Sequence, residues 1–238
     1  MFVIKPIWYL CQKFNMNKRL ILLFSLISTF LFTSCFEFVE EVSFNKDGSG
    51  SAVLTINLSK SKTKLASIML LDSINGYKVP SKTTIRNKVN EIVYKIKRTK
   101  GVHNVKNTLD FNEFIVTVSC DFDNVEALNE VISNFSSKKH VEAIKKNQHF
   151  TFNKVKKTFT RSHHFDLGKE FKKTKNQDRK VFETATYTSV YRFEEPIKST
   201  ENTQARISQS KKAIMLHLQA QDIISNTQTI KNKIQLEN

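Results

Sequence analysis

The stretch from Met16 to Cys35 constrains this chain more than any other, because it has the character of a targeting signal and not of a folded element. It opens with Lys18 and Arg19, continues through an apolar run from Leu20 to Phe32, and ends on small residues before the cysteine. The apolar run is shorter than the roughly 18 residues that indicate a membrane-spanning helix. The order of charged, apolar and small segments is that of a secretory signal peptide. We therefore expect residues 1–34 to be removed.

Residues 1–15 add a second apolar patch and Cys11 upstream of a stretch that is already a complete signal. We expect Met16 to be the true start and residues 1–15 to be a mis-assigned upstream extension. The alternative is a long amino-terminal region that is translated. In either case the segment is lost on processing.

The five residues Leu31-Phe32-Thr33-Ser34-Cys35 resemble the lipobox of bacterial lipoprotein precursors. The resemblance implies cleavage before Cys35, attachment of lipid, palmitate included, to its sulfur and amine, and a mature chain that begins at a membrane. It also implies a location outside the cytoplasm, in the cell envelope. We expect the outer membrane, with the protein facing the periplasm.

Removal of the leader takes away four basic residues and no acidic one, so the net charge falls from +16 to +12. The remaining chain of about 200 residues is long enough for one domain or two small ones with a real core. Cys11 lies in the leader and Cys35 is the expected lipidation site, which leaves Cys120 alone. No intramolecular disulfide is then possible, and stability has to come from the core.

Alternating apolar residues predict a β-hairpin directly after Cys35, with strands at 36–44 and 52–58 around the turn residues 45–50. A second hairpin is expected from 102–110 and 114–122, with Cys120 on the inward face as a buried thiol. Apolar spacing predicts helices over 59–72 and 83–98. A third helix is expected after Asp123, which would cap it with Glu126 at the capping-box position.

The turn 44–50 after a lipidated cysteine, together with the strand-to-helix step from Cys120 to Asn129, resembles LppM-type and related bacterial lipoproteins. The similarity covers about residues 35–135. It implies an anchored α+β domain, in some members with a carboxy-terminal membrane helix. No segment after Glu194 is long or apolar enough to be such a helix. The resemblance supplies no catalytic residues.

Residues 138–180 are strongly basic, with fourteen Lys or Arg against four acidic residues. Phenylalanines interleaved with lysines over 150–159 predict an exposed strand or hairpin, and 165–179 a helix or long loop. A plain solvated face and contact with anionic lipid or polysaccharide are the main alternatives. A nucleic-acid surface is disfavoured, because a lipidated chain lies outside the cytoplasm. The candidate contact residues are Lys154, Lys156, Lys157, Arg161, Lys172 and Lys173.

The last part of the chain, 181–238, reads as β-rich and as part of the same domain as the core at 35–137. A strand is expected over 184–193, a hairpin from 205–208 and 213–218, and a short helix over 219–226. A possible edge strand ends at Leu236, in a tail expected to fray.

Neither a metal site nor a cofactor is expected. Ser43, Asn45, Asp47 and Gly48 match the first places of a calcium-binding loop, but Leu54 stands where a bidentate glutamate is required. His140, His149, His163 and His164 show no zinc-site spacing. No nucleophile elbow, phosphate-binding loop or dinucleotide motif is present, so we expect no enzyme.

The sequence thus predicts an α+β fold in which antiparallel hairpins pack with about three amphipathic helices. The expected function is that of a lipid-anchored, non-enzymatic binding or structural domain of the bacterial cell envelope. Its partner is the membrane, held through the anchor. The alternative is a lipid-binding carrier or sensor with an apolar cavity between sheet and helices.

Overall fold

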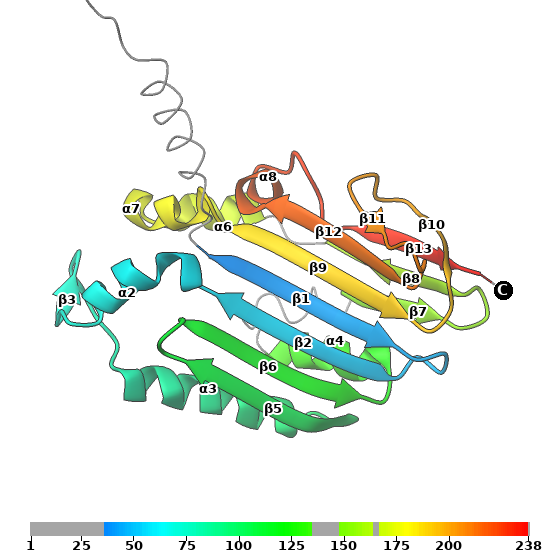
Figure 1. Ribbon diagram of the computed structural model, residues 1–238, viewed down its shortest axis with the longest axis horizontal. Coiled ribbons are helices and arrows are strands. Elements are labelled where there is room, and N and C mark those ends of the chain that lie inside the picture. Colours follow the sequence, from blue (N-terminus) through cyan, green and yellow to red (C-terminus); the bar gives the residue numbers. More distant parts are fainter. Residues whose placement is uncertain (1–35, 135–147, 164–166, 238) are drawn as a thin grey trace, which may run out of the picture. The chain divides into compact units, whose positions relative to one another are not determined.

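The computed structural model describes residues 36–134, 148–163 and 167–237, which belong to one compact unit. The leader, Cys35, residues 135–147 and 164–166, which include part of the basic region, and Asn238 lie outside the described residues. Within the described part, helices combine with largely antiparallel sheets, which is an α+β architecture (Figure 1).

The larger sheet has seven strands in the order β11-β12-β9-β1-β2-β6-β5. Its inner strands are formed by segments whose apolar residues alternate with Ser, Thr and Glu, so that one face is apolar and the other polar. The strands are β1 (Glu37–Phe44), β2 (Gly50–Asn57), β5 (Val102–Asp110), β6 (Ile115–Phe122), β9 (Thr186–Phe193), β11 (Arg206–Ile207) and β12 (Ala213–Gln219).

Both predicted hairpins are present, as β1–β2 and β5–β6. The first turn forms because Asp47 Oδ1 accepts hydrogen bonds from the backbone N–H of Ser49 at 2.9 Å and from its hydroxyl at 2.6 Å. Gly48 adopts a φ of +82° there, which favours glycine. Asp47 therefore acts as a turn residue.

One pairing in this sheet was not expected. β1 pairs with β9 in parallel, from Glu37 beside Thr186 to Phe44 beside Phe193. The expected antiparallel hairpins are present, but this parallel pair was not predicted; it forms because the chain between β2 and β9 returns β9 to the free edge of β1. Local alternation defines each strand but not its distant neighbour.

A second sheet has the order β10-β13-β8-β7. Its strands are β7 (Phe150–Asn153), β8 (Thr158–Arg161), β10 (Ile197–Thr200) and β13 (Asn232–Leu236). Two expectations fail here. The hairpin of β7 and β8 is not exposed, since Phe150 and Phe159 are fully buried, and β13 is an inner strand whose Leu236 is buried instead of frayed.

The helices exceed the expected three. The described ones are η3 (Ser59–Ser61), α2 (Lys62–Ile68), α3 (Lys82–Lys97), α4 (Val125–Asn134), α6 (Leu167–Lys173), α7 (Asn176–Arg179), η4 (Lys180–Phe182) and α8 (Ala220–Ile224). A small ladder of β3 (Ser73–Ile74) and β4 (Tyr77–Lys78) follows α2. In the described part of the chain, none of these helices has the length and apolar character needed to cross a membrane.

The capping of α4 also differs from the prediction. Asn124, and not Asp123, accepts the hydrogen bond from the backbone N–H of Ala127, at 2.9 Å. The Asp123 carboxylate instead contacts His103 Nε2 at 3.0 Å. The helix starts one residue later than predicted, and Asn is as good an N-cap as Asp.

The second sheet packs on the apolar face of the larger one through an aromatic cluster. Phe44 of β1 lies 4.8 Å from Phe159 of β8 and 5.6 Å from Phe193 of β9, measured between ring centroids. Helices α3 and α4 lie on the same side of the larger sheet, beside β5, β6 and the second sheet (Figure 1). Two different layers therefore share one face of one sheet, and the candidate site lies where they meet.

Candidate functional site

The main feature of the interior is an apolar cavity of about 650 Å³ between the larger sheet, α3, α4 and the second sheet. Its volume lies in the range of small-molecule sites. The strands contribute inward side chains such as Leu54, Ile56, Val118 and Cys120. The helices contribute Val89, Ile92 and Ile96 from α3 and Leu128, Val131 and Ile132 from α4.

Several apolar side chains that line the cavity remain partly exposed in the folded protein. Leu54 and Ile56 of β2 are each 37% exposed, and Ile92 of α3 is 39% exposed. A close-packed core would bury such residues almost completely. The helices thus pack incompletely against β2, and an apolar surface remains available in the space between them.

One end of this cavity carries charge. Arg161 of β8 and Glu40 of β1 form a forked ion pair, with Nε to Oε1 at 3.3 Å and Nη2 to Oε2 at 3.2 Å. Both side chains are largely buried, and both line the cavity. Tyr191 of β9 donates a further hydrogen bond to Glu40 Oε1 at 2.5 Å. The Phe150 ring lies 4.8 Å from the Arg161 guanidinium and covers it on another side.

The ionisation of this end follows from burial and proximity. Burial by itself would lower the pKa of Arg161, but the Glu40 carboxylate raises it, and the pKa lies above its ordinary value. Burial, together with the negative charge of Glu40, raises the pKa values of Tyr187 and Tyr191. Around neutral pH Arg161 is therefore a cation and both phenols are neutral.

The position of β7 beside the cavity depends on one side chain. Asn129 of α4 donates from Nδ2 to the carbonyl oxygen of Phe150 at 2.8 Å, and its Oδ1 accepts from the Phe150 N–H at 3.0 Å. Asn129 is buried, so both groups would otherwise lack water. This pair of bonds fastens the second sheet to α4.

Cys120 lies where the inward face of β6 was predicted to place it, buried and in the cavity wall. Burial raises the pKa of its thiol to about 11, and Asp121 adds to the rise. A thiol with that pKa is almost entirely protonated at neutral pH and is a poor nucleophile. The expectation of a structural thiol agrees with this environment.

The predicted anionic-contact residues are not brought together. Arg161 is only 7% exposed and belongs to the cavity, so its assignment to the surface is wrong. The sequence pattern misled because Arg161 follows the alternation of the buried Phe159, which places its side chain inward. Lys154, Lys156 and Lys157 lie at the β7–β8 turn, and Lys172 and Lys173 lie on α6, toward the opposite end of the domain (Figure 1).

Aromatic contacts show which of the two lysine groups, the one at the β7–β8 turn or the one on α6, lies near the expected anchor at Cys35. Phe36, the residue after Cys35, packs against Phe182 at 5.7 Å between ring centroids, and Phe182 packs against Phe171 of α6 at the same distance. Lys172 and Lys173 follow Phe171 directly. By contrast, the side chain of Lys154 reaches Gly48 in the β1–β2 turn, at the far end of β1.

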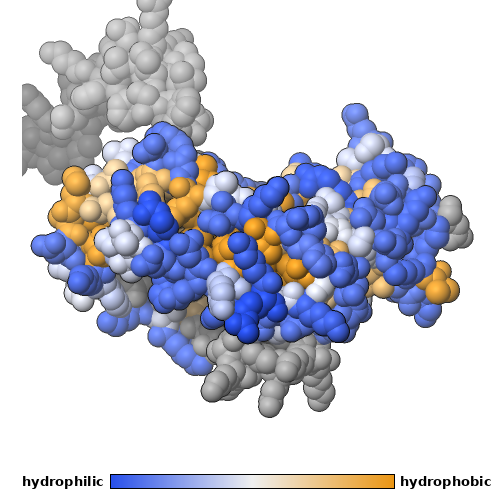
Figure 2. Space-filling model, turned by 90° about the horizontal axis from the view of Figure 1, so that it is seen from below, coloured by the Kyte–Doolittle hydropathy of each residue, from blue (hydrophilic) through white to orange (hydrophobic). Residues whose placement is uncertain are grey.

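An apolar patch follows α2. Leu70 is 88% exposed and Leu71 is 50% exposed, and the exposed Tyr77 of β4 carries the Lys175 ammonium over its ring at 4.9 Å. Figure 2 shows orange side chains at the left end of the molecule, the end where α2 lies in Figure 1. The surface near α2 is thus partly apolar with a basic residue beside it.

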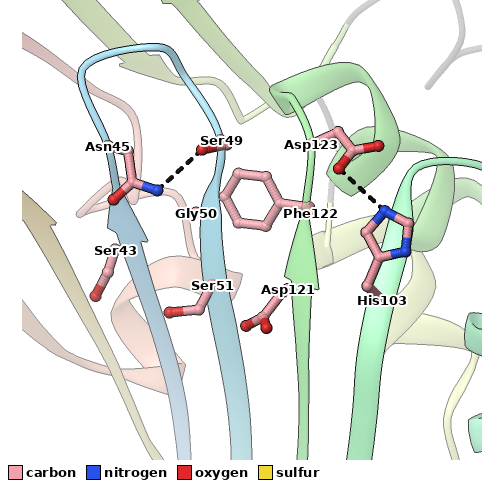
Figure 3. A pocket seen from close by; sticks show the side chains of 9 residues that line it. All are labelled: Ser43, Asn45, Ser49, Gly50, Ser51, His103, Asp121, Phe122 and Asp123. Atoms are coloured by element: carbon pink, nitrogen blue, oxygen red, sulfur yellow. Dashed lines mark hydrogen bonds and ion pairs between the residues drawn. The ribbon is translucent and has the colours of Figure 1, made fainter.

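A polar hollow lies at the other end of the larger sheet, beside the β1–β2 turn (Figure 3). Ser43, Ser51 and Asp121 lie on neighbouring strands, and His103 contacts Asp123 at its rim. Its carboxylates already have partners, since Asn104 Nδ2 donates to Asp121 at 2.7 Å. Because both carboxylates are engaged in this way, we assign no ligand to the hollow.

The histidines divide between interior and surface. His149 is buried beside Arg161, whose Nη1 lies 3.2 Å from its Nδ1. His163 lies 3.5 Å from the Thr229 hydroxyl. His140 and His164 lie outside the described residues. Among the residues that are described, no three His, Cys, Asp or Glu side chains are grouped as metal ligands would be.

The ion pair at the end of the cavity was missed at the sequence level, although a signal was present. Glu40 occupies the inward position between Phe38 and Val42, and a charged residue on an otherwise apolar strand face needs a buried partner. The next residue, Glu41, has a different partner, since its Oε2 lies 2.8 Å from Nη1 of Arg192.

Taken together, the fold and the cavity define an α+β protein whose sheet and helices leave an apolar, ligand-sized space with one charged end. The chain is similar in structure to the folded domain of LppM from Mycobacterium tuberculosis, solved by NMR. The TM-score is 0.42 and the identity 10%, over 85% of this chain and 90% of that one. No known protein family matches the sequence. No curated protein matches it either.

Proposed function

We propose that this protein is a non-enzymatic, lipid-anchored domain of the bacterial cell envelope that holds an apolar ligand, a lipid, in the cavity between its sheet and helices. The observation that carries the proposal is the cavity itself. Its walls are aliphatic side chains of β2, β6, α3 and α4, several of which keep a third or more of their surface uncovered.

A purely structural role is the main competing function. A structural domain gains stability by filling its core, and unfilled apolar space costs stability in proportion to its volume. A cavity of this size with partly exposed leucine and isoleucine side chains in its wall favours a carrier or sensor over a purely structural domain. The apolar lining also favours a hydrocarbon ligand over a polar metabolite, because polar groups that enter it lose their hydration.

The membrane location rests on the leader and on chain geometry. β1 begins at Glu37, two residues after the expected lipidation site at Cys35. Such a short connection would keep the domain within a few residues' reach of the bilayer. A lipid-binding cavity held there is well placed to exchange ligand with the membrane or to sense its composition.

The ligand is tested by lipid extraction. A soluble chain of residues 36–238 contains every described element, so it is expressed in the periplasm of a bacterial host, purified without detergent, and its bound lipid identified by mass spectrometry. Val118→Phe fills the cavity from β6, whereas Thr117→Phe adds the same ring on the opposite face of the strand. We expect stoichiometric lipid with wild type and with Thr117→Phe, and much less with Val118→Phe. Equal, trace amounts in all three would reject a ligand-binding function.

The anchor is tested separately by intact mass of the protein from native membranes, beside a Cys35→Ala variant. A wild-type mass that matches a chain starting at Cys35 plus acyl groups, with a variant that keeps its leader, supports the envelope location. An unlipidated native chain that retains Met1 or Met16 would reject it.

A further inference from the structure

The charged end of the cavity suggests which lipids it accepts. We propose that Arg161 and Tyr187 bind the uncharged oxygen-bearing headgroup of a single-chain lipid, such as a long-chain alcohol or a monoacylglycerol, while its hydrocarbon chain occupies the apolar part. This inference rests on the proposed function, because it concerns the same cavity. It adds the chemistry by which one lipid would be preferred over another.

Unused hydrogen-bonding capacity points to a ligand at this end. Arg161 has five N–H groups, and four have acceptors: two on Glu40, one on His149 Nδ1 and one on the carbonyl oxygen of Ser162 at 2.8 Å. For the fifth, on Nη2, no hydrogen bond of acceptable geometry is made to a described residue, although the Tyr187 hydroxyl lies nearby. An arginine N–H in an apolar wall lacks water and gains from an acceptor on a ligand.

Tyr187 presents a second such group. Its side chain lines the cavity and is only 9% exposed, and its hydroxyl makes no hydrogen bond of acceptable geometry with a described residue. Arg161 and Tyr191 lie close enough to lower its pKa, but no hydrogen bond of acceptable geometry joins the Tyr187 hydroxyl to either of them. Buried phenol hydroxyls normally have a partner. A ligand oxygen between Tyr187 and Arg161 would supply one to each.

The charge balance of the site selects an uncharged headgroup. Arg161 is already neutralised by Glu40 through two bonds of the forked pair. His149 adds no charge in this arrangement, because an arginine can only donate, so Nδ1 must accept. A fatty-acid carboxylate would therefore bring an unpaired negative charge beside Glu40, in a region with little water. An alcohol or ester oxygen accepts the same hydrogen bonds without that penalty.

The order of polar and apolar walls in the cavity fits a lipid with one polar end. The polar groups Glu40, Arg161 and Tyr187 belong to β1, β8 and β9, whereas Leu54, Val118 and Ile92 lie on β2, β6 and α3. The larger sheet has β9, β1, β2 and β6 as successive neighbours, so polar and apolar walls follow one another across it. A lipid with one polar end and one tail matches this order.

The experiment uses soluble residues 36–238 and the neutral, apolar fluorophore N-phenyl-1-naphthylamine, displaced by lipids of equal chain length at about pH 8. Hexadecanol and 1-monopalmitoylglycerol are expected to displace the fluorophore at concentrations about tenfold lower than hexadecanoate does. Tyr187→Phe should weaken hexadecanol binding by about three- to tenfold relative to fluorophore binding, because the apolar fluorophore does not need the hydroxyl, which makes no hydrogen bond of acceptable geometry with a described residue. Tyr77→Phe, which changes an exposed tyrosine elsewhere, is the matched control.

The outcomes separate the two proposals. If wild type does not bind the fluorophore or any of the lipids, both the cavity function and its headgroup preference fail. If the fluorophore binds but hexadecanoate competes as well as hexadecanol, or Tyr187→Phe binds hexadecanol like wild type, the headgroup preference is overturned and the cavity function stands.

Discussion

Glu40 on β1 and Arg161 on β8 form a forked ion pair inside the protein, although 121 residues separate them in the chain. The pair joins the larger sheet to the second sheet at the end of the cavity. Removal of one partner leaves the other as an uncompensated buried charge, which typically costs about 3–5 kcal/mol. The pair therefore links the stability of the two sheets to each other, and it also forms the charged end of the cavity.

We expect Arg161→Met to lower the free energy of unfolding by about 3–5 kcal/mol, because Glu40 then stays buried without its cation. The double variant Glu40→Gln/Arg161→Met removes both charges and should recover a large part of that loss. Urea denaturation of wild type, both single variants and the double variant measures the coupling. Additive losses would show that the two side chains do not interact in the folded protein.

The Asn129 contacts predict a second stability effect. Asn129→Leu removes both hydrogen bonds to the Phe150 backbone and leaves a buried N–H and C=O unsatisfied, so we expect a loss of about 2–4 kcal/mol. Asn107→Leu, on the exposed side of the edge strand β5, makes the same change in solvent and should cost less than about 0.5 kcal/mol. Thermal unfolding of both variants gives the comparison. Equal losses would contradict the fastening role of Asn129.

The raised pKa of Cys120 predicts that the free energy of unfolding depends on pH. The folded protein holds the thiol proton up to about pH 11, whereas the unfolded chain releases it near its ordinary pKa of 9.0. This contribution to stability is therefore fully present below about pH 9 and is lost as the pH rises through about 11. Tyr187 and Tyr191 also have raised pKa values and add to the fall above about pH 10.

Urea denaturation at about pH 8 and about pH 10.5 tests this contribution. Wild type should lose on the order of 1–2 kcal/mol more over this interval than Cys120→Ala, which has no thiol and keeps both tyrosines. The quantity to compare is the change in unfolding free energy between the two pH values, because the smaller alanine side chain lowers stability at every pH. Identical pH profiles would show that the thiol titrates alike in both states.

The separation of the basic residues predicts that only one group acts near the membrane. Lys172 and Lys173 follow Phe171, which is linked through Phe182 to the residue after Cys35. Lys154 and Lys156 lie beyond the other end of β1, about 25 Å away for an eight-residue strand. That distance exceeds the Debye length of about 8–10 Å at physiological salt, so charges there contribute little at the anchored end.

Sedimentation with phosphatidylglycerol-containing vesicles, at low and at physiological salt, compares the two lysine groups in membrane binding. The assay uses two forms of the protein: the lipidated protein after detergent removal, and soluble residues 36–238. For the soluble chain, Lys172→Glu/Lys173→Glu should weaken binding by at least about tenfold, because each lysine near an anionic surface contributes about 1 kcal/mol. Lys154→Glu/Lys156→Glu should change the binding of the lipidated protein little. An equal effect of both double variants in the lipidated protein would argue against the anchored orientation.

Local patterns in the sequence carried much of the fold. Alternation of apolar residues along 36–44 and 114–122 defined β1 and β6 with nearly correct ends, and the Asp47-Gly48 turn closed the first hairpin. The periodic spacing of Val89, Val93 and Ile96 located α3 and its buried stripe. These features depend on residues within a few positions of one another, which is why they are readable in one dimension. The same proximity explains the inward Cys120.

Tertiary structure alone decided the parallel pairing of β1 with β9, the inner position of β13 and the burial of Arg161. Each depends on which distant segment covers a given face, and strand alternation is the same whether a face meets solvent, a helix or a second sheet. The cavity has the same origin. Glu40 and Leu54 were visible in the sequence as inward positions, but the space beside them exists because α3, α4 and the second sheet share one face of the larger sheet without filling it.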